Sequence, residues 1–122
     1  MKTILLVDNH EGFRNSIVKY FVVGGMEVAE CASAPEALER LKKGGIDIVL
    51  TDLNMPGMTG LELIEAVRAN PSWDGIPIFI LSVTENEHLI RRAMDLGAAG
   101  YLQKPFSLDE FLSMARKFVP DL

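Results

Sequence analysis

Residues 47–62, DIVLTDLNMPGMTGLE, contain the signals for a strand, a turn and a helix start, in that order. The part from 47 to 52 is mostly apolar, as in strands that are buried on both faces of a parallel sheet. Asp, Asn, Pro and Gly then appear within residues 52–57, and these residue types favour a turn. Thr59 and Glu62 have the spacing of a capping box, in which a hydroxyl at the helix start precedes Glu by three residues. The stretch therefore predicts one strand–loop–helix unit.

The same unit recurs along the chain, because apolar strand-like runs alternate with helix-like segments five times. The predicted strands are Thr3–Asp8, Glu27–Cys31, Asp47–Asp52, Ile76–Leu81 and Gly100–Gln103. Since right-handed crossovers put helices on both faces of a parallel sheet, this alternation predicts a (βα)5 three-layer α/β sandwich.

Local signals mark where the helices between these strands begin and end. Further capping-box spacings start helices at Ser33, Thr84 and Ser107. We expect left-handed C-caps at three glycine sites, which are Gly24-Gly25, Gly44-Gly45 and Gly97. The pair Asn70-Pro71 should end the third helix.

Composition restricts the class of protein. The 122 residues carry 12 basic and 17 acidic side chains without a basic stripe, which argues against direct nucleic-acid binding. No apolar run is long enough to cross a bilayer, so no membrane contact is expected. The single cysteine, Cys31, fits a reducing cytoplasm and is predicted to be a small buried hydrophobe. We expect one cytoplasmic domain over residues 1–122, with no internal repeat, linker or secretion leader.

The chemistry should lie at the carboxyl ends of the strands, where open parallel sheets bind ligands. The polar residues predicted at those ends are Asp8, Asn9, Asp52, Ser82 and Lys104. Each has a simpler explanation when taken alone: a helix cap for the first two, a turn, a buried hydroxyl and a surface charge. Together, acids, a hydroxyl and a lysine at one edge of the sheet indicate a functional site.

Three stretches carry a resemblance to a known family. LLVD at 5–8, LTDLNMPGMTG at 50–60 and GAAGYLQKPF at 97–106 resemble the signature blocks of response regulator receiver domains, of the chemotaxis-regulator type, from two-component signal transduction. The resemblance spans the chain and implies a flavodoxin-like fold with strand order 2-1-3-4-5. It also implies that the Lys104–Pro105 bond is cis.

The family resemblance assigns a role to each residue at this edge. It implies that Asp52 accepts the phosphoryl group, that Lys104 pairs with the phosphoryl charge and that Ser82 hydrogen-bonds a phosphoryl oxygen. It implies a Mg²⁺ site formed by Asp8, Asp52, Asn9 and the backbone carbonyl of Asn54. It also implies a rotamer switch formed by Ser82 and Tyr101. These roles agree with the chemistry, because Mg²⁺ prefers oxygen ligands and phosphoryl transfer to a carboxylate needs both anions neutralised.

Asn9 departs from the family pattern, which has a second acid at this position. An amide keeps an oxygen ligand but removes one negative charge, which costs roughly 1–4 kcal/mol of attraction to a cation in a surface-like dielectric. The sequence therefore predicts a functional site with a changed metal affinity.

The resemblance also implies partners. A sensor histidine kinase or a phosphotransfer protein would donate the phosphoryl group, and the chain would be a phosphoacceptor that assists its own phosphorylation and dephosphorylation rather than a separate enzyme. The surface would be formed by the fourth predicted helix, which follows the strand Ile76–Leu81 (helix 4), by the fifth strand Gly100–Gln103 (strand 5) and by the helix after it (helix 5). It would contact a downstream effector, a fused domain or a second copy. On helix 4 we expect His88, Arg91, Arg92 and Asp95 to face outward, and Leu89, Ile90, Ala93 and Met94 to face inward. On helix 5 the outward residues would be Asp109, Glu110, Ser113 and Lys117.

Two other functions stay open at this point. A degenerate receiver would bind partners without being phosphorylated, and Asn9 is the feature that favours it. A flavodoxin-like electron carrier would need a phosphate-cradling loop after the first strand, where the acids would repel a phosphate. A dinucleotide enzyme is disfavoured because no Gly-x-Gly-x-x-Gly follows that strand. His10 and His88 are interpreted as isolated, solvated helix residues.

Overall fold

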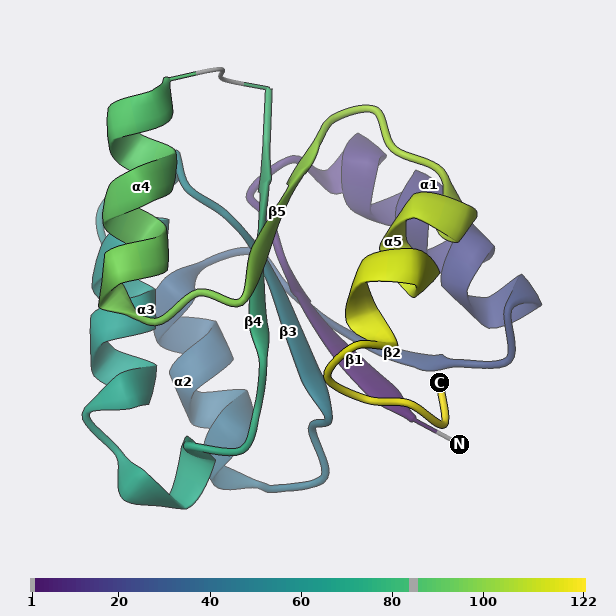
Figure 1. Cartoon of the computed structure of the whole chain (residues 1–122), viewed down its shortest axis with the longest axis horizontal. Coiled ribbons are helices and arrows are strands. Elements are labelled where there is room, and N and C mark those ends of the chain that lie inside the picture. The colour runs from purple at the N-terminus through teal and green to yellow at the C-terminus, as the bar shows by residue number, and fades with distance from the viewer. Residues whose placement is uncertain (1, 84–85) are drawn as a thin grey trace.

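The computed structural model describes residues 2–83 and 86–122 as a parallel sheet between two layers of helices (Figure 1). The strands are β1 Thr3–Val7, β2 Glu27–Cys31, β3 Ile48–Asp52, β4 Ile78–Ser82 and β5 Gly100–Gln103. The helices are α1 Glu11–Val23, α2 Ala34–Lys42, α3 Gly60–Arg68, the short 3-10 helix η1 Pro71–Trp73, α4 Glu87–Leu96 and α5 Leu108–Ala115. The strand order is β2-β1-β3-β4-β5, so the predicted flavodoxin-like (βα)5 fold is confirmed.

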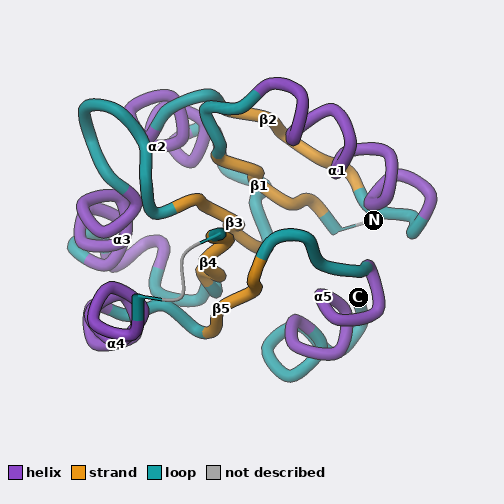
Figure 2. The backbone as a smooth tube through the Cα atoms, turned by 90° about the horizontal axis from the view of Figure 1, so that it is seen from above, coloured by secondary structure: helices purple, strands orange, loops and turns teal. Residues whose placement is uncertain are grey.

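The alternation of side chains along the strands divides the core into two parts. On β1, Leu5 and Val7 face a core that α2, α3 and α4 cover, whereas Ile4 and Leu6 face a core that α1 and α5 cover. Figure 2 shows the two helix groups on opposite sides of the sheet. The central strands are buried on both faces, which explains why their sequences are nearly continuous apolar runs. Among the described residues, no helix is both long and apolar enough to cross a bilayer.

The helix starts agree with the sequence in three of four cases. Thr59 and Ser107 begin α3 and α5 with complete capping boxes. Ser33 caps α2 by accepting a hydrogen bond from the backbone N–H of Glu36, but the Glu36 carboxylate accepts from the N–H of Ala32 instead. The prediction for α4 is wrong: Thr84 lies outside the described residues, and the N-cap is Asn86, whose side chain accepts from two backbone N–H groups.

Several predicted boundaries also shift by one or two residues. β1 ends at Val7, β3 begins at Ile48, and β4 covers Ile78–Ser82 rather than Ile76–Leu81. Gly25, not Gly24, takes the left-handed conformation after α1. On α4, Met94 was expected on the buried side but is exposed, because the face toward the sheet is centred on Ala93.

Candidate functional site

Four strands deliver polar side chains to one edge of the sheet. Asp8 directly follows β1, Asp52 and Ser82 are the last residues of β3 and β4, and Lys104 directly follows β5. The side chains of Asp8 and Ser82 are fully buried, and Asp52 is nearly so. Buried acids are costly unless they are paired, so this set needs an internal partner for its charge.

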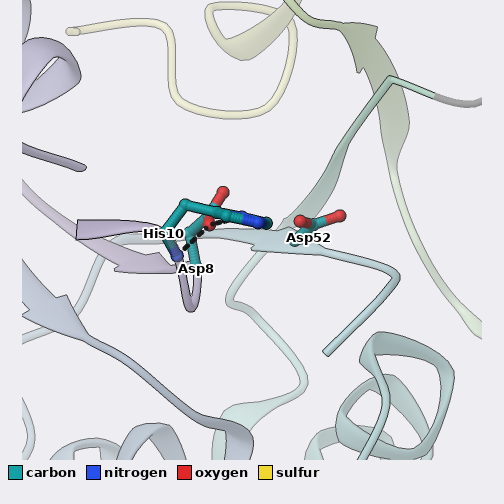
Figure 3. A group of neighbouring side chains, drawn as sticks. All are labelled: Asp8, His10 and Asp52. Carbon is teal, nitrogen blue, oxygen red and sulfur yellow. Dashed lines mark hydrogen bonds and ion pairs between the residues drawn. The ribbon is translucent and has the colours of Figure 1, made fainter. Parts of the chain in front are cut away.

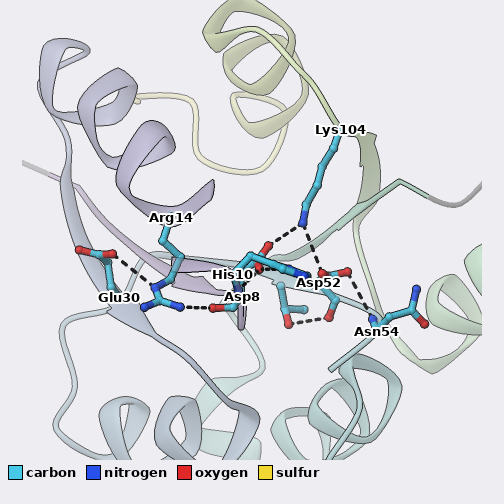
Figure 4. Close-up of polar contacts among 8 residues, drawn as sticks. Asp8, His10, Arg14, Glu30, Asp52, Asn54 and Lys104 are labelled. Carbon is cyan, nitrogen blue, oxygen red and sulfur yellow. Dashed lines mark hydrogen bonds and ion pairs between the residues drawn. The ribbon is translucent and has the colours of Figure 1, made fainter. Parts of the chain in front are cut away.

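Lys104 supplies that partner. Its Nζ donates hydrogen bonds to Asp8 Oδ2 at 2.6 Å and to Asp52 Oδ2 at 3.3 Å, with 11% of the side chain exposed (Figure 4). The ammonium also lies 4.1 Å from the centre of the Phe13 ring, a cation–π contact from α1. The backbone N–H of Lys104 donates to the carbonyl of Ser82, which fixes the loop after β5 against the end of β4. The Lys104–Pro105 bond is cis, as the resemblance implies.

Local contacts hold Asp52 in place. The backbone N–H of Asn54 donates to Asp52 Oδ1 at 3.3 Å, and the Thr51 hydroxyl donates to the carbonyl of Asp52 at 3.0 Å. Gly60 lies so close to this strand end that a Cβ there would meet the carbonyl oxygen of Asp52. The start of α3 can therefore pack against the end of β3 only with glycine at this position.

Asp8 is held from α1 and from the loop before it. The guanidinium of Arg14 donates to the carbonyl of Asp8 and lies 3.5 Å from the carboxylate of Glu30 on β2. The backbone N–H of His10 donates to Asp8 Oδ1 at 2.8 Å. This bond closes a turn through Asn9, so that Asp8 shapes the loop but neither Asp8 nor Asn9 caps α1. The N-cap is His10, whose side chain makes no capping bond.

His10 is the residue that sequence reasoning missed. Its Nδ1 lies 3.0 Å from Asp8 Oδ1, and Figure 3 shows its ring extending from Asp8 toward Asp52. The interpretation of His10 as an isolated helix residue is therefore wrong. Its sequence position two residues after the strand-end acid was a usable signal, because Asp commonly accepts a hydrogen bond from the backbone two residues on.

The donor set fits a divalent cation. Ligand atoms of Asp8, His10 and Asp52 lie within 4.8 Å of one another. Two carboxylates and one lysine leave one negative charge, and two carboxylates meet what Mg²⁺ usually requires from a protein. Asn54 is exposed next to this group, and its N–H contact ties its backbone to Asp52. Asn9 is also exposed.

A pocket opens in front of Asp52. Its lining combines charged and apolar side chains: His10, Phe13, Asp52, Asn54, Val83, Lys104 and Pro105. A small anion that entered this pocket would meet the ammonium of Lys104 next to the carboxylate of Asp52. The arrangement therefore allows a phosphoryl group to approach an oxygen nucleophile.

Tyr101 lies on the same face of the sheet as Ser82. Tyr101 of β5 pairs with Ile80 of β4, and Ile80 lies two residues before Ser82. Because strand side chains alternate with a period of two, Ile80, Ser82 and Tyr101 share one face. Tyr101 is half-buried against the core on the α4 side. Ser82 and Tyr101 therefore lie on the face of the sheet that α2, α3 and α4 cover.

Comparisons with known proteins agree on one family. The family model described as the response regulator receiver domain matches residues 4–116 of this chain. Chemotaxis protein CheY of Pseudomonas aeruginosa is 36% identical over 106 residues, which are 85% of this chain and 85% of that protein. The regulatory protein VirG of Agrobacterium tumefaciens is 32% identical over 119 residues, 95% of this chain but 43% of VirG. This chain thus spans less than half of that relative.

A solved structure agrees with this result. The chemotaxis protein CheY4 of Vibrio cholerae superposes with a TM-score of 0.89 at 30% identity, covering 97% of this chain and 98% of that one.

Proposed function

Because this chain belongs to the response regulator receiver family of two-component systems, we propose that Asp52 accepts a phosphoryl group from a sensor histidine kinase or a phosphotransfer protein. A carboxylate oxygen of Asp52 attacks phosphorus, and the phosphorus–nitrogen bond of the donor phosphohistidine breaks as the new oxygen–phosphorus bond forms. The electron pair of the broken bond leaves with the donor imidazole. The product is an acyl phosphate on Asp52.

The observation that carries this proposal is the position of Lys104 between two buried carboxylates. An incoming phosphoryl group brings further negative charge next to Asp52, and the ammonium offsets it at short range in a partly water-excluded site. The Ser82 hydroxyl is placed at the neighbouring strand end, where it would donate to a phosphoryl oxygen. Mg²⁺ held by Asp8, Asp52 and the carbonyl of Asn54 would supply the remaining positive charge.

The output would come from the surface of α4, β5 and α5. We infer that Ser82 moves toward the phosphoryl group and that Tyr101 follows it, since both lie on one face of adjoining strands. Such a change acts at a distance because it favours one of two packings of the same elements. The partner would be a downstream effector, a fused domain or a second copy of the chain. The same proposal treats residues 1–122 as a single cytoplasmic receiver domain.

Intact-mass measurement with Mg²⁺ and a small phosphodonor tests the acceptor. We expect one added phosphoryl group on the parent protein and none on Asp52→Ala. The control is Asp95→Asn, which changes an exposed aspartate of α4 and should gain one phosphoryl group like the parent. An unlabelled parent protein would favour the degenerate receiver. Labelling of Asp52→Ala at the parent rate would show that the acceptor is another residue.

Amide NMR with a beryllofluoride mimic of the phosphoryl group tests the switch. We expect shifts at Tyr101 and across α4 in addition to those around Asp8, Asp52 and Lys104. Shifts confined to the loops at the strand ends would contradict the proposed route through Tyr101.

A further inference from the structure

We propose that His10 supplies an imidazole ligand to the metal site, so that this receiver binds a borderline transition-metal ion such as Co²⁺, Ni²⁺ or Zn²⁺ in strong preference to Mg²⁺. The inference rests on the proposed metal site and concerns only its ligand set. Asn9 has lost the usual carboxylate charge, and the next residue places a nitrogen donor beside Asp8.

The distances between donor atoms support a shared ion. Nδ1 of His10 and Oδ1 of Asp8 are 3.0 Å apart. Neighbouring ligands on an octahedron with bonds of about 2.1 Å are about 3.0 Å apart, and opposite ligands about 4.2 Å. The atoms of Asp8, His10 and Asp52 lie within 4.8 Å of one another, so a small turn of one side chain brings all three within that limit.

The hydrogen bonds of Asp8 leave room for this ligand. Lys104 contacts Oδ2 of Asp8, whereas both contacts of His10 are with Oδ1. An ion on the Oδ1 side therefore does not have to displace the ammonium. It would replace the contact between Nδ1 and Oδ1 with a bond from each of these atoms to the metal, and the neutral ring would then carry its proton on Nε2, with the Nδ1 proton lost to solvent.

The backbone contact keeps His10 beside the carboxylate of Asp8. The N–H of His10 donates to Asp8 Oδ1, which holds the residue at the site, while 65% of the side chain is exposed. The ring makes no capping bond to α1. Neutral imidazole is a good ligand for Zn²⁺, Ni²⁺ and Co²⁺, whereas Mg²⁺ takes oxygen ligands and keeps several waters. Loss of the ring should thus affect the two classes of ion unequally.

Calorimetric titration of the unphosphorylated protein with Co²⁺ and with Mg²⁺ tests the inference. For His10→Ala we expect Co²⁺ affinity to fall at least about tenfold, the scale seen for groups that support metal ligands. Mg²⁺ affinity should change by less than about threefold, because oxygen ligands dominate that ion. His88→Ala removes an exposed histidine of α4 and is the matched control, with no change for either ion.

Side-chain ¹⁵N NMR with Zn²⁺ gives a second readout that does not depend on a variant. We expect Nδ1 of His10 to shift on saturation and the ring of His88 to stay unchanged. An unchanged Co²⁺-to-Mg²⁺ ratio in His10→Ala, or an unshifted His10 ring, overturns the inference. No phosphodonor is present in either experiment, so the result is independent of whether Asp52 is phosphorylated.

Discussion

Charge balance among Asp8, Asp52 and Lys104 decides the behaviour of the site at the scale of single residues. Both carboxylates are buried, and the same ammonium donates to each of them. Removal of that cation would leave two like charges in a region of low dielectric, where unpaired ions are costly. The metal-free protein therefore depends on Lys104 for stability as well as for its proposed chemistry.

Lys104→Met keeps most of the side-chain length and removes the charge. We expect a loss of about 3 kcal/mol in the free energy of unfolding without metal, the lower end for a broken buried ion pair. Added Mg²⁺ should recover part of that loss, since the cation restores the balance at the same carboxylates. Urea unfolding with and without Mg²⁺ measures both effects, with Lys117→Met, an exposed lysine, as the control. Equal stability of the two variants without metal would contradict this account.

At the scale of the elements, the sequence predicted most of what the structure contains. Apolar periodicity located all five strands, and capping boxes at Thr59 and Ser107 located the starts of α3 and α5. The start of α4 was missed, because Asn86 offers a cap as good as a hydroxyl and lies directly before Glu87. Which of two nearby cap candidates is used depends on packing that the local sequence does not specify.

The same limit applies to the site. Asp8, Asp52, Ser82 and Lys104 follow from strand ends and from motif resemblance, since each belongs to a signature block or ends a strand. The spacing of Asp8 and His10 predicts the backbone bond between them, but the position of the His10 ring depends on the path of a single turn. The contact of Lys104 with Phe13 joins residues that are far apart in the chain. Such contacts need three-dimensional coordinates.

The junction of β3 and α3 gives a test at the same scale. Gly60→Ala would bring a Cβ against the carbonyl of Asp52 and 2.8 Å from Cα of Leu53, so backbone must move. We expect the free energy of unfolding of Gly60→Ala, measured in urea, to be lower by about 2 kcal/mol or more, as for other overpacked sites. Gly12→Ala in α1 has open space and is the control, with a gain of up to about 1 kcal/mol from helix propensity. A gain at both positions would show that α3 does not need the close approach.

In the whole protein, one sheet lies between two hydrophobic cores, and Cys31 lies in one of them. The reactivity of its thiol therefore tests whether that core is packed. Cys31 is 6% exposed at the end of β2 and belongs to the core under α2, α3 and α4. Burial raises the pKa of its thiol, with a further contribution from the carboxylate of Glu36. The folded state therefore holds the proton more tightly than the unfolded state does.

Two consequences follow for Cys31. A thiol reagent should label Cys31 slowly in the folded protein and rapidly in urea. The control is Ser113→Cys, which places a second thiol at an exposed position of α5 and should add a fast phase to the labelling of the folded protein.

The free energy of unfolding should also fall as pH rises above about 8.5, where the thiol ionises in the unfolded state and is still protonated in the folded state. Cys31→Ala should flatten that part of the pH profile. Immediate labelling of Cys31 in the folded protein would contradict the described packing.

Asp52 is the one residue proposed to carry the phosphoryl group. His10 lines the same pocket as Asp52, and the carboxylate of Asp8 lies beside both of them. A gain in mass alone therefore does not identify which of these residues is the acceptor. Reduction of the phosphorylated protein with borohydride converts an acyl phosphate into an alcohol, and peptide mass spectrometry then locates it. We predict homoserine at residue 52 and unmodified side chains at 8 and 10. A reduced residue at position 8, or a stable phosphohistidine at position 10, would contradict the account.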